Sequence, residues 1–168
     1  LGAATAEAQE KVAVQIAEQI SDYLKTGAIS NAVNTFSLTA KEYSTLKPYL
    51  KLANLLGSFA GQLTENPIKS VRVEFEGQTA NLNSQPILQT IVFALLKPAG
   101  DSVNLINSLI VAKSKSIEIS SVNHQRESEY QSLIRLIITT EKQTRSVCGT
   151  LFGGEPRIVE IKGIRINA

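Results

Sequence analysis

The sequence predicts an α+β fold: an N-terminal helical arm, then a mainly antiparallel sheet with helices packed on one face. Three observations support this prediction. Apolar residues recur at helical spacing over residues 6–26, 39–62, 85–96 and 102–113. They alternate with polar residues over 69–76 and again in the last third of the chain. Short turns join the strands of that last third, which favours antiparallel neighbours.

The helical arm is the first predicted element and covers residues 6–26. Thr5 suits the N-cap position, and Gly27 suits the position just after the last helical turn. Residues 28–38 lack a helical period, so we place a domain boundary near residue 36. The apolar stripe of the helix follows four-residue spacing through Val12, Ile16 and Ile20.

A second helix is predicted over residues 39–62, with Thr39 or Ser37 as its N-cap. Pro48 lies in its interior, where proline removes a hydrogen bond and clashes with the preceding turn. We therefore expect either a kink at Pro48 or one short helix followed by another.

Residues 69–76 form the clearest predicted strand. Apolar and polar side chains alternate along it, so we expect one buried face and one face in water. Two helices are then predicted, over residues 85–96 and 102–113, separated by a break at 97–100 that contains proline and glycine. The residues expected in water are Arg72, Glu74 and Glu76.

The last third of the chain is rich in predicted strands. Turns are expected at residues 140–143 and 153–156, the second containing Gly153 and Gly154. In the final strand the apolar phase changes at Gly163, which predicts a bulge or a tight bend there. The strands are expected around Ile117 and Ile119 and over residues 133–139, 144–152 and 157–166.

Composition excludes several classes of function. The 168 residues carry a net charge of +2, too small to indicate nucleic-acid binding. No apolar run reaches the ~18 residues of a membrane span. Cys148 is the only cysteine and His124 the only histidine, which rules out an internal disulfide and a Cys/His zinc cluster. The chain lacks Met and opens directly into a helix, so we expect it to be part of a larger protein.

Few residues point to chemistry. Neither a phosphate-binding loop nor a dinucleotide-binding glycine pattern is present. His124 is flanked by carboxylates and would suit a general base, but we favour a polar loop between two strands. Cys148 lies among strand residues and is interpreted as a small buried hydrophobe.

Three basic residues lie near the end of the chain: Arg157, Lys162 and Arg165. A convergent pair of them would bind phosphate or carboxylate. The alternative is a solvated edge strand that charge protects from further pairing. The residues by themselves favour this alternative.

The opening nine residues, Leu-Gly-Ala-Ala-Thr-Ala-Glu-Ala-Gln, resemble a stretch of the D-3-phosphoglycerate dehydrogenase family. In that family a similar stretch directly follows the catalytic His, with Ser more common at the position of Ala4. Residues 30–34 are similar to the family's return into its substrate-binding domain. The pair Asn123-His124 and residues 149–153 and 157–163 resemble the intervening domain of the long form of this enzyme.

The resemblance implies a division of the chain. Residues 1–36 would be the C-terminal helix and return segment of the catalytic region. Residues 37–168 would be the intervening allosteric substrate-binding domain. The catalytic His and the NAD-binding domain would precede Leu1, and a serine-sensing ACT domain would follow Ala168. The chain itself would then hold no catalytic, cofactor-binding or metal residue, bind no cofactor and be inactive alone.

The resemblance also implies a function for the parent protein. The family oxidises 3-phosphoglycerate to phosphohydroxypyruvate with NAD, the committed step of L-serine biosynthesis. A cytoplasmic homo-oligomer is expected, without nucleic-acid or membrane partners. The intervening domain is thought to bind an anionic effector, phosphate or the substrate. Arg157 occupies a matching basic position, whereas a second basic ligand would lie past the end of the chain.

Two other functions stay open. One is a non-enzymatic anion- or small-molecule-binding module of another serine-metabolism protein, such as L-serine dehydratase, which leaves residues 1–34 unexplained. The other is a purely structural dimerisation domain, for which neutralising Arg157 would change no response to anions.

Overall fold

The computed structural model describes residues 38–100, 102–125, 129–162 and 164–165. The predicted helix at 6–26 and the predicted boundary near residue 36 lie outside the described residues. The elements in chain order are α2 (Ala40–Leu63), β1 (Ile68–Gly77), a 3-10 turn (Gln78–Asn81), α3 (Ser84–Leu96), a second 3-10 turn (Lys97–Ala99), α4 (Ser108–Ser114), β2 (Glu118–His124), β3 (Ser132–Thr140), β4 (Thr144–Phe152), β5 (Glu155–Ile161) and β6 (Ile164–Arg165).

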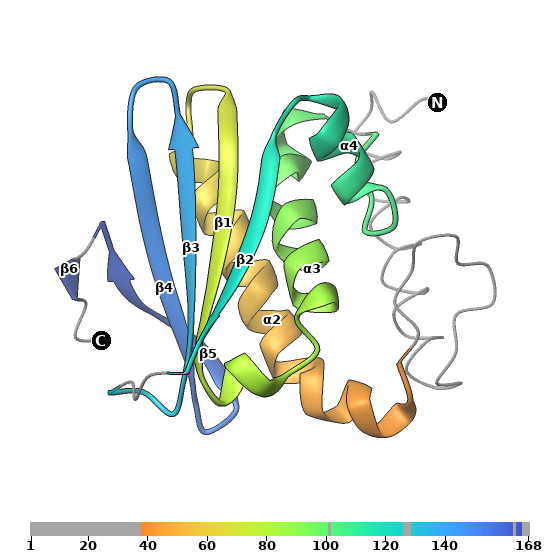
Figure 1. Cartoon of the computed structure of the whole chain (residues 1–168), viewed down its shortest axis with the longest axis vertical. Helices are drawn as coiled ribbons and strands as arrows, with labels where there is room; N and C mark the ends of the chain where they lie inside the picture. The colour runs from red at the N-terminus through yellow and green to blue at the C-terminus, as the bar shows by residue number, and fades with distance from the viewer. Residues whose placement is uncertain (1–37, 101, 126–128, 163, 166–168) are drawn as a thin grey trace.

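The strands form one six-stranded sheet in the order β2-β1-β3-β4-β5-β6. Only β1 and β2 are parallel, and the other neighbouring pairs are antiparallel. The connection between the parallel pair passes through α3 and α4, as a parallel crossover requires. Helices α2 and α3 lie side by side along one face of the sheet (Figure 1). The predicted α+β class with a mainly antiparallel sheet is therefore confirmed.

Helix α2 begins at a capping box built on Thr39. The Thr39 hydroxyl accepts a hydrogen bond from the Glu42 N–H at 3.2 Å, and the Glu42 carboxylate accepts one from the Thr39 N–H at 2.7 Å. The backbone hydrogen bond from Thr39 lowers the pKa of Glu42 below its ordinary value. Of the two predicted caps, Thr39 is thus the correct one.

Helix α2 continues through Pro48 as one element. Of the two alternatives predicted at Pro48, two successive helices is wrong, because one unbroken helix runs from Ala40 to Leu63. The α2 ribbon changes direction along its length in Figure 1, as expected for a helix with an internal proline.

The hydrophobic core fills the space between the two long helices and the sheet. Its fully buried members include side chains from α2, α3, β1 and β3. The two helices approach closely at Gly57, where a Cβ atom would lie 2.5 Å from the Ile91 carbonyl oxygen. Representative core residues are Leu52, Leu56, Val73, Phe75, Ile91 and Leu136.

Two other elements differ from their predicted extents. Helix α4 begins at Ser108, not near residue 102. Asn104 and Asn107 exchange side-chain to backbone hydrogen bonds of 2.7 and 2.9 Å, so a polar turn replaces the first predicted helical turns. The predicted final strand is two strands, because β6 pairs antiparallel with β5, and the tight bend between Ile161 and Ile164 agrees with the bend predicted there.

Candidate functional site

The face of the sheet that points away from α2 and α3, called the open face here, carries the most unusual chemistry of the described residues. On β1 it presents Arg72, Glu74 and Glu76, which were predicted to lie in water. Arg72 is exposed, but Glu74 and Glu76 are only 8% and 4% exposed. The prediction is wrong for these two carboxylates because side chains from the neighbouring strands flank them.

The strand register explains how these side chains meet. Glu74 lies opposite Arg135 of β3, Arg135 lies opposite Cys148 of β4, and Cys148 lies opposite Glu160 of β5. On the other side of β1, Glu76 lies opposite His124 of β2. Directly opposed residues share a face of a sheet, so these side chains form a polar row across the strands.

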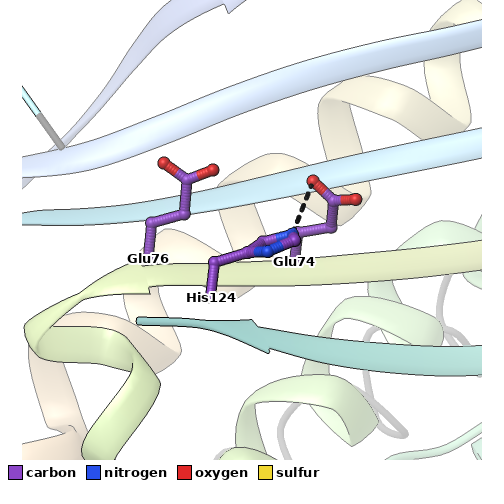
Figure 2. Close-up of side chains that lie close together, drawn as sticks. All are labelled: Glu74, Glu76 and His124. Carbon is purple, nitrogen blue, oxygen red and sulfur yellow. Dashed lines mark ion pairs between the residues drawn. The ribbon is translucent and has the colours of Figure 1, made fainter. Parts of the chain in front are cut away.

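Glu74 is the centre of this arrangement. One carboxylate oxygen, Oε1, lies 3.3 Å from Arg72 Nε. The other, Oε2, lies 3.5 Å from Arg135 Nη1 and 3.5 Å from His124 Nε2. Arg135 Nη1 also lies 3.7 Å from Glu76 Oε1, so the guanidinium faces both buried carboxylates. Figure 2 shows Glu74, Glu76 and His124 rising from β1 and β2 on the same side.

Cys148 extends the arrangement onto β4. Its thiol is buried and free, and its sulfur accepts a hydrogen bond of 3.1 Å from Arg135 Nε. Burial raises the pKa of Cys148 to about 11, although the Arg135 guanidinium acts in the opposite direction. The predicted burial of Cys148 is confirmed, and the residue also anchors Arg135.

His124 does not lie in a polar loop, contrary to the prediction. It is the last residue of β2, because the parallel ladder with β1 extends as far as the Glu76–His124 pair. Its Nε2 atom is buried and has no hydrogen-bond partner. Side-chain oxygen or nitrogen atoms of Glu74, Glu76 and His124 all lie within 4.8 Å of one another, an arrangement able to hold a metal ion.

The basic residues near the chain end are placed on separate features. Arg157 lies on β5 opposite Thr150 and is exposed. Lys162 follows β5 with a left-handed φ of 53° and lines a surface hollow of about 290 Å³. Arg165 lies on β6 opposite Glu160. The described lining of the hollow is Gln143, Thr144, Arg145, Ser146 and Lys162, without Arg157.

The fold is thus that of a sheet domain covered by helices on one face, with an ionic cluster on the other. Among its described helices, none has the length and apolar character needed to span a bilayer. A family model described as the D-3-phosphoglycerate dehydrogenase intervening domain matches residues 45–162. The chain belongs to this family.

Named relatives agree with the family match. The chain is 35% identical to D-3-phosphoglycerate dehydrogenase of Bacillus subtilis (strain 168) over 99% of its length and 32% of the relative. It is 37% identical to the protein of that name from Synechocystis sp., again over 99% of the chain and 31% of the relative. The chain is 29% identical to the Methanocaldococcus jannaschii protein of that name, over 99% of the chain and 32% of the relative. The chain spans about a third of the length of the curated relatives it matches.

Proposed function

We propose that this chain is the regulatory and assembly segment of an NAD-dependent D-3-phosphoglycerate dehydrogenase that acts in L-serine biosynthesis in the cytoplasm. The observation that supports this most directly is the intervening-domain match over residues 45–162. The matched relatives carry the dehydrogenase name, which disfavours a module of L-serine dehydratase. In this proposal residues 1–36 end the catalytic region and residues 37–168 form the regulatory domain of a homo-oligomer.

The chemistry in this proposal belongs to the rest of the enzyme. The catalytic His and the NAD site would lie in other parts of the polypeptide, and this segment would contact the catalytic and ACT domains. The proposal therefore predicts dehydrogenase activity for the complete polypeptide and none for the 168-residue chain.

This prediction is tested by purifying both proteins and following NADH formation from 3-phosphoglycerate. The complete polypeptide is expected to turn over, and the 168-residue chain is expected to give no signal above a blank. Activity of the short chain would overturn the proposal, and so would a complete polypeptide that oxidises other substrates but not 3-phosphoglycerate.

The proposed effector contact is Arg157. Within the described part of the chain its guanidinium forms no ion pair, and it is exposed on β5, so it is available to an anion. A hydrogen bond to a charged partner contributes about 1.5–3 kcal/mol, which corresponds to roughly tenfold or more in affinity. Arg157→Gln in the complete enzyme should therefore raise the half-effect concentration of phosphate about tenfold or more.

Lys142→Gln is the matched control, because Lys142 is also exposed and basic but lies in the β3–β4 turn. It removes the same charge and should leave the phosphate response unchanged. If Arg157→Gln behaves like Lys142→Gln, the domain has a structural role and Arg157 is not an effector contact.

A further inference from the structure

We propose that Glu74, Glu76 and His124 form a binding site for a borderline divalent cation such as Zn²⁺. The site lies on the open face, between β1 and the edge strand β2. Its donor atoms already lie within 4.8 Å of one another, and both carboxylates are buried. This inference is independent of the proposed dehydrogenase activity, because it concerns only residues of the described domain.

The spacing of two donors fits zinc. Bond lengths of about 2.0–2.2 Å at a tetrahedral angle place two neighbouring zinc ligands about 3.4 Å apart. Glu74 Oε2 and His124 Nε2 lie 3.5 Å apart. A cation bound to both atoms therefore requires almost no rearrangement of either side chain, and Glu76 lies beside them (Figure 2).

A buried nitrogen of the His124 ring also supports a cation at this position. Its Nε2 atom is shielded from solvent and has no hydrogen bond, although it points toward Glu74. A buried nitrogen without a partner costs free energy, and coordination would remove that cost. Arg72 Nε and Arg135 Nη1 lie 3.3 and 3.5 Å from the Glu74 oxygens. Charge-assisted hydrogen bonds are commonly about 2.7–2.9 Å, so this carboxylate retains capacity for a closer ligand.

Arg135 does not occupy the proposed position. The strand order places His124 on one side of β1 and Arg135 on the other. Glu74 Oε2 lies 3.5 Å from each, so a cation on the β2 side can bind while Arg135 keeps its hydrogen bond to Cys148. Repulsion between Arg135 and the cation lowers the affinity but does not block the site.

The donor set selects the class of cation. One imidazole and two carboxylates suit Zn²⁺, whereas Ca²⁺ prefers six to eight oxygen ligands and Mg²⁺ an octahedral shell of oxygen and water. A bound cation would join the last residue of the edge strand to the neighbouring strand. The inferred consequence is a firmer β1–β2 pairing at this end of the sheet.

The test uses the single histidine of the sequence. Because His124 is the only histidine, its imidazole ¹⁵N signals in the wild-type chain report coordination without any mutation. Zn²⁺ added to chelator-treated protein should shift the Nε2 signal and saturate at one equivalent. Ca²⁺ at the same concentration should leave the signal unmoved. A Nε2 signal that Zn²⁺ leaves in place would overturn the proposal.

Variants then assign the ligands. Glu74→Gln and Glu76→Gln should each weaken Zn²⁺ binding at least about tenfold, since even groups that only orient a ligand contribute 10- to 100-fold. Glu118→Gln is the matched control, because Glu118 is an exposed carboxylate on the same strand as His124. Cys148→Ser should bind Zn²⁺ as tightly as the wild-type chain, and this result would exclude the thiol as the ligand. Equal affinity in Glu74→Gln and Glu118→Gln would contradict the site, and circular dichroism confirms that each variant is folded.

Discussion

The two faces of the central strand β1 are both buried, one by apolar side chains and the other by charged and polar side chains. Toward the helices it presents Val71, Val73 and Phe75, all 1% exposed or less, which pack against apolar side chains. Toward the open face it presents Glu74 and Glu76, which are nearly as buried but lie among charged and polar groups. Burial alone therefore does not reveal which residues form the core of this domain.

The difference has an energetic meaning. Apolar burial on the helix side stabilises the fold with little dependence on partner geometry. Buried carboxylates remain favourable only while their cationic partners stay in place, because an uncompensated buried charge is costly. The free energy of unfolding should therefore fall when side-chain volume is removed on the helix side. On the open face it should fall when a charged residue loses its partner.

The largest effect is expected from Phe75→Ala on the helix side. Phe75 is fully buried, so removing its ring should lower the free energy of unfolding by about 3–5 kcal/mol. Urea unfolding measures this change. Arg72→Ala is the control on the same strand, because the Arg72 side chain is 49% exposed and should contribute less than about 1 kcal/mol. Similar losses for the two variants would contradict the assignment of the core to the helix side.

A smaller effect is expected from Arg135→Met on the open face. This change leaves Glu74 and Glu76 without the guanidinium that faces both. Breaking a fully buried pair costs about 3–5 kcal/mol, but the Arg135 side chain is 24% exposed and solvent screens part of this, so about 1–3 kcal/mol is expected.

The companion variant Glu74→Gln distinguishes charge from packing at this position. In the Arg135→Met background it removes one of the two carboxylates that have lost the guanidinium, so the double variant should be more stable than additivity predicts. Strictly additive losses in urea unfolding would show that Arg135 acts through packing alone.

The sequence was informative wherever the structure depends on local spacing. The apolar spacing of Leu46, Leu50 and Leu56 located helix α2, and Thr39 was one of its two candidate caps. The alternation of Val71, Val73 and Phe75 located β1 and its helix-facing side. Each of these signals lies within a few residues of the element that it predicts.

The cluster on the open face depends on pairing between distant segments. His124 reaches Glu74 only because β2 pairs parallel with β1 in one register, and Arg135 arrives from the other side through β3. A shift of one residue would turn either side chain to the opposite face. No local pattern specifies this register, which is why Glu74 and Glu76 were expected in water.

Arg157 is a different case. The sequence predicted that Arg157 lies on a strand, whereas its proposed role as an effector contact came from a resemblance to a family. The structure places Arg157 on β5 and Lys162 beside a separate hollow, so the two basic residues do not belong to one described site.

The smallest expected effect concerns Cys148, which links the charged row to the β4 side of the open face. Its raised pKa of about 11 leaves roughly 0.1% thiolate at pH 8, so iodoacetamide should label the folded protein far more slowly than the urea-unfolded protein. Rapid labelling of the folded protein would mean that the thiol is accessible and that the open face is looser than described.

The Cys148 thiol should also make the free energy of unfolding depend on pH in the alkaline range. The folded protein keeps the Cys148 proton up to a pH of about 11, whereas the unfolded chain releases it near the ordinary cysteine value. The folded state therefore binds more protons in this window, and stability should fall as pH rises through it. Cys148→Ala removes that group, so its unfolding free energy should decline less between pH 9 and pH 11. Parallel declines in the two proteins would show that the thiol is not held in its neutral form by burial.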